Sequence, residues 1–175
     1  MKIITDNNLV FIGFMGAGKT TVGQLLARKL NRVFIDTDEA IEQEYGMPVS
    51  HIFKEYGELE FRNKEKSLIT DLCQKKNLVL SLGGGAFLQE EIRNVCLTKS
   101  VVIYLDISFT NWKDRMALLM DTRPILQNKT LQEMEELYNS RQAIYAHHHI
   151  KINVNGKGPE EIADFIIDKL PLKQN

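Results

Sequence analysis

The sequence predicts an α/β fold: a three-layer sandwich in which helices cover both faces of a five-stranded parallel sheet. Short apolar runs alternate with longer amphipathic segments along the chain, which is typical of such sheets. A glycine-rich motif stands between the first apolar run and the first amphipathic segment. The length of 175 residues suits one domain with a substantial core, so we expect a single domain over 1–175.

The expected elements follow from this alternation. The predicted strands are residues 9–14, 32–36, 78–82, 100–106 and 150–154. The predicted helices are residues 19–30, 57–75, 109–119, 130–146 and 159–170. The last helix opens with Pro159 and Glu160, which suit a first helical turn. Ligands of parallel sheets collect beyond the carboxyl ends of the strands, so candidate site residues are those that follow each strand.

Two stretches interrupt the simple alternation. Residues 38–75 contain more helix than one crossover needs, which predicts an additional helical insertion. Residues 116–129 contain Pro124 and little clear periodicity, which predicts a mobile loop.

Composition narrows the classes of protein. The formal net charge of −1 offers no electrostatic attraction to nucleic acid or an anionic membrane surface. No run approaches the roughly 18 apolar residues of a membrane span, and no targeting segment is evident. The two cysteines, Cys73 and Cys96, have no metal-site spacing, so we expect a reduced cytoplasmic protein.

Residues 13–20, GFMGAGKT, fit the pattern G-x-x-x-x-G-K-[ST] without a gap. Glycines let the backbone curl so that its N–H groups surround phosphate oxygens, and the helix that follows presents its positive end to the same anion. Lys19 can reach the β- and γ-phosphates, and the Thr20 hydroxyl can bind Mg²⁺. The alternative is a glycine-rich turn that only caps the helix, but chance produces this pattern on the order of once in a hundred chains of this length.

The loop alone does not separate a kinase from a GTPase or a motor. A GTPase of this size normally shows an N-K-x-D guanine signature. The nearest match, NKT at 128–130, is followed by Leu131, which disfavours a GTPase switch.

Two aspartates follow the second predicted strand in FIDTDEAI. Asp36 ends the strand and is placed to support Mg²⁺ beside the phosphates. Asp38 fits two roles equally well when taken alone: it can accept a hydroxyl proton from the phosphate acceptor, or cap the helix that starts beside it. The phosphate loop and Asp36 favour the catalytic role.

The third predicted strand ends in SLGGGAF. Many phosphate-loop proteins end this strand in an Asp that helps to hold Mg²⁺, whereas here Ser81 occupies the comparable position, which shifts metal binding toward Thr20 and Asp36. One glycine suffices for a strand-to-helix turn, so the three at 83–85 favour a loop that faces a ligand.

Three arginines lie at informative positions. Arg62 has Glu65 three residues later, on the same helical face, where it can hold the guanidinium. Arg123 lies in the irregular segment, and Arg141 in a predicted helix. Each alone fits an ordinary surface arginine, but planar guanidinium groups also suit a carboxylate or phosphate ligand.

Taken together, these motifs resemble the shikimate kinase family from about residue 9 to about residue 168. The motifs are GFMGAGKTT, FIDTDEAIE, IFKEYGELEFRNKE, LSLGGGAF, TRPIL and SRQAIY. The resemblance implies a small kinase of the nucleoside monophosphate kinase type, with a substrate-binding insertion at about 37–65 and a lid at about 116–129. The implied reaction transfers the ATP γ-phosphoryl group to the 3-hydroxyl of shikimate, on the route to chorismate and aromatic amino acids. A monomer that acts on ATP and shikimate is expected.

The resemblance also implies roles on the nucleotide side. Lys19 and Thr20 serve the phosphates and Mg²⁺, and Asp36 supports the metal. Arg115 and the loop at 155–159 are the nearest matches to the adenine contacts of similar proteins. The implied nucleotide-binding positions are Gly16, Ala17, Gly18, Lys19, Thr20, Thr21, Arg115, Arg123 and Pro159.

On the acceptor side, the resemblance makes Asp38 the partner of the shikimate hydroxyls and the candidate base. Arg62 and Arg141 hold the shikimate carboxylate. Arg123 is the lid arginine that reaches both ligands, and it forms the catalytic set with Asp38 and Lys19. The remaining implied contacts are Gly83, Gly84, Gly85, Phe53 and Phe61.

Two other functions stay open. A kinase for another small metabolite, such as gluconate or a nucleoside monophosphate, shares the phosphate loop, but the arginines and glycines favour a carboxylated polyol. An ATP-binding protein without kinase activity is the alternative outside the enzyme class. Other features have simpler explanations: His147–His149 fit a helix end, Trp112 fits packing, and Cys73 fits a buried position.

Overall fold

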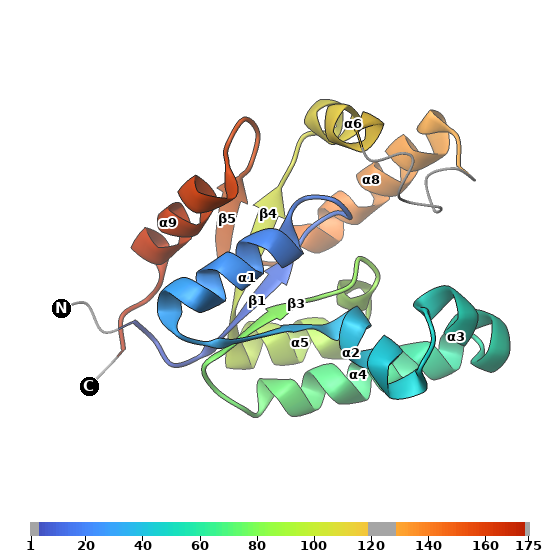
Figure 1. The fold of residues 1–175 in the computed structure, drawn as a ribbon, viewed down its shortest axis with the longest axis horizontal. Helices are drawn as coiled ribbons and strands as arrows, with labels where there is room; N and C mark the ends of the chain where they lie inside the picture. The colour runs from blue at the N-terminus through green and yellow to red at the C-terminus, as the bar shows by residue number, and fades with distance from the viewer. Residues whose placement is uncertain (1–3, 119–128, 174–175) are drawn as a thin grey trace.

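A computed structural model describes residues 4–118 and 129–173 (Figure 1). Its centre is a five-stranded sheet in the order β2-β3-β1-β4-β5, and every neighbouring pair is parallel. The strands are β1 Asn8–Ile12, β2 Val33–Asp36, β3 Leu78–Ser81, β4 Ser100–Asp106 and β5 Ile150–Asn153. This confirms the predicted sheet. The first strand ends two residues earlier than predicted because the chain turns into the phosphate loop at Gly13.

Helices cover both faces of the sheet (Figure 1). On one face α1 Lys19–Leu30 packs against α9 Pro159–Lys169. The other face carries α4 Glu58–Cys73, α5 Glu90–Lys99 and α8 Leu131–Tyr145. The helix α6 Phe109–Ala117 lies beyond the carboxyl end of β4. The three-layer prediction is therefore correct.

One helix was not predicted. No element was predicted for residues 83–99, where the structure has a 3-10 turn, η1 Ala86–Leu88, followed by α5. The sequence does contain a signal for α5. Two glutamates lie in its first turn, and the buried residues Ile92 and Cys96 are four residues apart. The helix has only 10 residues, so its apolar period repeats over fewer than about three turns.

The predicted insertion between β2 and α4 consists of two helices, α2 Thr37–Tyr45 and α3 Val49–Tyr56. They share a small apolar cluster with α4, built on Ile41, Ile52 and Phe61. This cluster is separate from the main core around the sheet, so the insertion projects from the body of the protein beside the carboxyl ends of the strands (Figure 1).

Several smaller predictions can be compared with the structure. Cys73 is buried, as predicted, and its Sγ lies 3.9 Å from that of Cys96. The histidines follow the end of α8, and Nδ1 of His148 lies 2.8 Å from the Tyr145 carbonyl oxygen, as a helix end predicts. Most of the predicted lid, residues 119–128, lies outside the described residues. Across the described ranges, no helix combines the length and apolar character needed to cross a membrane.

Candidate active site

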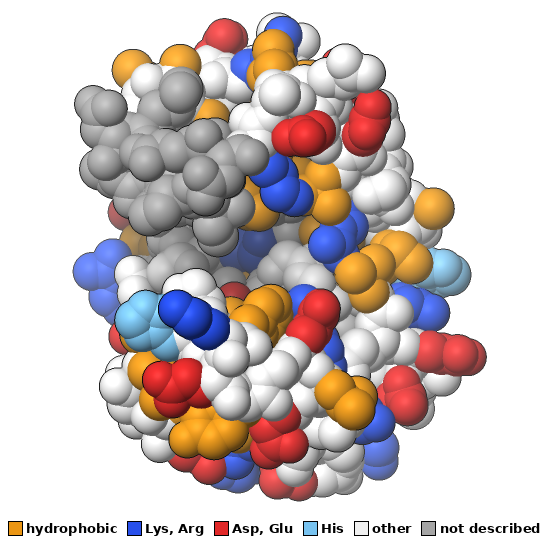
Figure 2. Space-filling view, turned by 90° about the vertical axis from the view of Figure 1, so that its right-hand side faces the viewer, with side chains coloured by type: hydrophobic (Ala, Val, Ile, Leu, Met, Phe, Trp, Pro, Cys, Tyr) orange, Lys and Arg blue, Asp and Glu red, His pale blue; other side chains and the backbone are white. Residues whose placement is uncertain are grey.

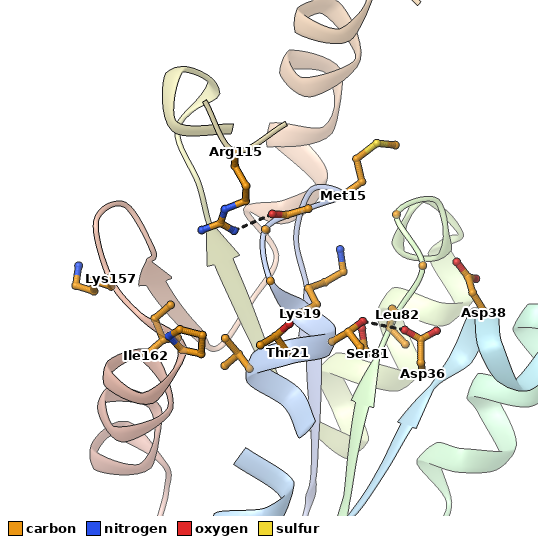
Figure 3. A pocket seen from close by; sticks show the side chains of 18 residues that line it. Met15, Lys19, Thr21, Asp36, Asp38, Ser81, Leu82, Arg115, Lys157 and Ile162 are labelled. Atoms are coloured by element: carbon orange, nitrogen blue, oxygen red, sulfur yellow. Dashed lines mark hydrogen bonds between the residues drawn. The ribbon is translucent and has the colours of Figure 1, made fainter. Parts of the chain in front are cut away.

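A pocket of about 440 Å³ opens beyond the carboxyl ends of the strands. Residues from the phosphate loop, from the ends of β2 and β3, from α6 and from the start of α9 line it. Figure 2 shows the hollowed face of the protein, and Figure 3 shows Lys19 between Asp38 on one side and Lys157 and Ile162 on the other. The predicted phosphate-loop residues and the predicted acids therefore border one cavity.

The phosphate loop connects β1 to α1, which begins at Lys19. Nζ of Lys19 donates hydrogen bonds to the carbonyl oxygens of Gly13 (2.6 Å) and Phe14 (3.2 Å), so the ammonium group lies over the loop. The other loop positions predicted to bind nucleotide, Gly16, Ala17, Gly18, Thr20 and Thr21, also line the pocket. The loop thus places a cation and a helix N-terminus together in the cavity, the combination that binds phosphate.

The two predicted metal-binding residues lie together. The Thr20 hydroxyl donates to Oδ2 of Asp36 at 3.1 Å. The other carboxylate oxygen of Asp36 accepts the backbone N–H of Glu39, so Asp36 is the N-cap of α2. A hydroxyl and a carboxylate at the pocket wall are oxygen donors of the kind that Mg²⁺ prefers, so these residues fit such an ion.

Asp38 is not the helix cap. It lies within the first turn of α2, and the capping role belongs to Asp36. The Asp38 carboxylate instead lies against Gly83, where an added Cβ would stand 2.5 Å from Oδ1. Burial, followed by the negative charges of Glu65 and Asp36, raises the Asp38 pKa to about 6, although Lys19 and Arg62 oppose the shift. A carboxyl group with this pKa is ionised near neutral pH and is a stronger base than an ordinary aspartate.

Arg62 is held by an ion pair with Glu65, as predicted. Its Nη1 donates to Oε2 of Glu65 at 2.8 Å, and the Glu65 side chain is almost completely buried (1% exposed). Nε2 of Gln89 donates to the same Glu65 oxygen at 2.9 Å, which links α4 to the start of α5. Burial raises the pKa of Glu65, and the hydrogen bonds from Arg62 and Gln89 oppose that shift.

The guanidinium of Arg62 lies over the rings of Phe53 and Phe61, 5.8 and 5.3 Å from their centroids. It also lies against Gly85, where an added Cβ would stand 2.5 Å from Nη2. The two predicted aromatic residues therefore support the arginine from the insertion side, and the glycine leaves room for it.

Arg141 reaches the same glycine loop from α8. Its Nη1 donates to the Gly84 carbonyl oxygen at 3.3 Å, and the Tyr145 hydroxyl donates to that oxygen at 3.4 Å. The loop at 83–85 thus has a carboxylate at Gly83 and guanidinium groups at Gly84 and Gly85. The helices α2, α4 and α8 supply these groups, although they are far apart in the sequence.

At the other end of the pocket, Arg115 donates from Nη1 to the Gly16 carbonyl oxygen at 2.8 Å (Figure 3). Pro159 lines this end together with Lys157 and Ile162. Arg123, predicted for the lid, lies outside the described residues.

Several residues at the site were not predicted from the sequence. Lys157 and Ile162 line the pocket, Gln89 holds Glu65, and Tyr145 bonds to the glycine loop. Lys157 had a signal, because it lies in the loop already associated with the adenine. Ile162 and Tyr145 lie in predicted helices, and Gln89 precedes the unpredicted helix α5, so only their tertiary contacts reveal the three.

The interpretation of Trp112 as packing was incomplete. Its ring is buried, but Nε1 also donates a hydrogen bond to the Met15 carbonyl oxygen of the phosphate loop at 2.9 Å.

The fold and the site define a small-metabolite kinase of the phosphate-loop class, since the pocket at the phosphate loop also reaches Asp38 and the glycine loop, which Arg62 and Arg141 contact from outside the pocket lining. The sequence model of the shikimate kinase family matches residues 15–171. The chain belongs to the shikimate kinase family.

Individual relatives agree. A shikimate kinase of Oceanobacillus iheyensis is 50% identical over 97% of this chain and 92% of its own length. A solved structure, a shikimate kinase from Acinetobacter baumannii in complex with shikimate, is 34% identical with a TM-score of 0.85, covering 94% of this chain and 92% of its own. A gluconokinase from Sinorhizobium meliloti 1021 has a TM-score of 0.57 at 18% identity, covering 91% of this chain and 88% of its own, which shows a shared fold alone.

Proposed function

We propose that this enzyme transfers the γ-phosphoryl group of ATP to the 3-hydroxyl of shikimate, which yields shikimate 3-phosphate and ADP on the route to chorismate. The observation that carries the proposal is the arrangement around the glycine loop. Asp38 contacts Gly83, Arg62 contacts Gly85, and Arg141 donates to the Gly84 carbonyl. A carboxylated polyol is complementary to this set, with its hydroxyls toward the acid and its carboxylate toward the arginines.

Asp38 is the proposed base. A positioned carboxylate can accept the hydroxyl proton as the acceptor oxygen attacks phosphorus. The phosphate loop and Lys19 hold the transferring phosphoryl group and stabilise its negative charge. Arg62 and Arg141 fix the acceptor, which limits its freedom to orientations in which the hydroxyl faces Asp38.

Mg²⁺ is proposed at Thr20 and Asp36, whose donor oxygens lie 3.1 Å apart beside the phosphate loop. When bound, the ion neutralises phosphate charge. Ser81 lines the same wall and is proposed to contribute through water.

The remaining assignments are proposals of the same kind. The nucleotide contacts are the loop residues with Arg115 and Pro159, and Arg123 is the lid arginine that reaches both ligands. Residues 37–65 form the shikimate-binding insertion and 116–129 the lid. A cytoplasmic monomer without nucleic-acid or membrane partners is consistent with a net charge of −1 and two free cysteines.

The test is ADP release from Mg-ATP, compared among shikimate, gluconate, AMP and no acceptor. We expect ADP only with shikimate. ADP formation with gluconate or AMP instead would assign a different acceptor to the same fold. A folded protein that binds ATP without acceptor-dependent ADP would favour a binding protein over a kinase.

A further inference from the structure

Four consecutive carbonyl groups of the phosphate loop accept hydrogen bonds from side chains. A loop that turns its N–H groups toward a phosphate must turn many of its carbonyls away from it. Lys19 donates to the first two carbonyls of the loop, those of Gly13 and Phe14. The next two, those of Met15 and Gly16, accept from Trp112 and Arg115. Helix α6 therefore supplies two of the side-chain donors that hold the back of the loop.

Trp112 is the more rigid of these two donors. Its side chain is buried (2% exposed), stacks on Phe109 with centroids 5.4 Å apart, and meets Phe14 of the loop edge to face at 5.5 Å. Tyr138 from α8 contacts both phenylalanine rings. The ring contacts with Phe109 and Phe14 fix the orientation of the indole, so its single donor, Nε1–H, has a defined direction.

Helix α6 also packs closely against the loop at Gly16, the residue after Met15. Gly16 has a φ of +75°, and an added Cβ there would lie within van der Waals overlap of the Met116 side chain. The helix therefore packs against the loop backbone through Met116 while it bonds to the loop through Trp112. Displacement of the indole would release the Met15 peptide, whose orientation sets the direction of the neighbouring N–H groups.

We infer that Trp112 is a positioning residue for ATP: its Nε1–H···O=C bond to Met15 holds the phosphate loop in the shape that receives the triphosphate. The inference rests on the proposed function, because it deepens the account of the same nucleotide site. Trp112 itself touches neither substrate in this proposal and acts only through the loop. We therefore expect an effect on nucleotide affinity that is separate from shikimate binding.

The experiment removes the donor without changing the shape of the ring. Trp112 is the single tryptophan of the chain, so expression in a tryptophan auxotroph supplied with benzothienylalanine replaces this side chain alone. In that analogue sulfur takes the place of the indole N–H. Trp112→Phe is the genetically encoded counterpart. Affinity for ADP and for a non-hydrolysable ATP analogue is measured by titration calorimetry, and KM and kcat are measured for both substrates.

We expect nucleotide affinity to fall about tenfold in both proteins, because binding must then restore a loop shape that the lost hydrogen bond no longer holds. The KM for shikimate at saturating ATP stays within about twofold of the wild-type value. The matched control is Tyr138→Phe, which deletes a hydrogen bond from the same aromatic group to the Ile107 carbonyl (2.6 Å). It should lower the melting temperature without weakening nucleotide binding.

Nucleotide affinity within twofold of wild type in the benzothienylalanine protein would overturn the inference. Equal weakening by Tyr138→Phe would also overturn it, because the effect would then belong to the aromatic group as a whole. Calorimetry needs no phosphate acceptor. A wild-type protein that binds ADP but shows no turnover with shikimate would therefore refute the proposed reaction while the binding comparison still decides the role of Trp112.

Discussion

The carboxylate of Asp38 lies directly against Gly83: a Cβ at residue 83 would stand 2.5 Å from Oδ1 and 2.6 Å from Oδ2. The same loop meets Arg62 two residues later, where a Cβ on Gly85 would stand 2.5 Å from Nη2. Hydrogen atoms at these two positions therefore allow the proposed base and one of the proposed carboxylate ligands to approach the loop.

Alanine substitutions at these two glycines should have different kinetic effects. Gly83→Ala displaces the proposed base, and we expect kcat to fall about a hundredfold, since a misplacement of about 1 Å can have that effect. Gly85→Ala displaces Arg62, and we expect the shikimate KM to rise on the order of tenfold. Steady-state kinetics of both variants check this, with ATP affinity as the internal control. The same kinetic defect in both variants would contradict separate roles for the two ends of the loop.

Asp38→Asn should abolish turnover, retain ATP binding and stabilise the fold near neutral pH. The Asp38 pKa is raised from 3.8 to about 6 in the folded protein, so folding favours the protonated form. The stability that the protonated Asp38 side chain contributes is fully present below about pH 4 and is lost as the pH rises through 6. An uncharged asparagine avoids this loss, which lowers the free energy of unfolding of the wild type by up to about 3 kcal/mol at pH 7.5.

Urea unfolding of Asp38→Asn and wild type at about pH 4 and pH 7.5 measures this difference. The two proteins should be similar at the lower pH, and the variant should be more stable at the higher one. Lower stability of the variant at pH 7.5 would show that the ionised carboxylate is stabilised by the site.

The activity should fall in mild acid. A general base must be ionised, and the Asp38 pKa is raised to about 6 by burial and by neighbouring carboxylates. We therefore expect kcat/KM for shikimate to decline about tenfold for each pH unit below 6. A pH–rate profile from about pH 5 to 8 checks this, with circular dichroism as a control for folding. A profile that stays flat down to pH 5 would exclude Asp38 as a base with this pKa.

Two carboxylates paired with Arg62 provide a matched comparison. Glu65 lies 2.8 Å from Nη1 with a side chain 1% exposed, whereas Glu58 lies 3.5 Å from Nε with a side chain 67% exposed. Glu65→Gln should raise the shikimate KM on the order of tenfold, because Arg62 loses its buried partner. Glu58→Gln should leave that KM within about twofold, as exposed pairs contribute little.

The same two variants, Glu65→Gln and Glu58→Gln, also test whether the charge of Glu65 raises the Asp38 pKa. The charge of Glu65 raises the Asp38 pKa, so Glu65→Gln should move the acid limb of the pH–rate profile below 6. Glu58→Gln should leave the limb in place. An unchanged limb in Glu65→Gln would mean that burial and Asp36, without Glu65, set the Asp38 pKa.

Much of this protein was predictable from local sequence. Alternating apolar and amphipathic segments defined the parallel sheet, and the phosphate loop was identified because its function needs particular residues at fixed spacing. Arg62 and Glu65 were paired correctly, since residues three apart share a helical face. Two local features were not predicted: the short helix α5, and the N-cap of α2, which is Asp36, whereas a cap at Asp38 had stayed open as the alternative to a catalytic role.

The sequence by itself determined the fold class, the phosphate loop and the set of polar side chains available for the acceptor, because those properties depend on neighbours in the chain. Only the tertiary structure decided which of these side chains meet. Gln89 lies 24 residues from its partner Glu65, and Trp112 lies 97 residues from Met15. Such pairs have no periodic signal in the sequence, since they form only when the sheet and its helices bring distant segments to one edge.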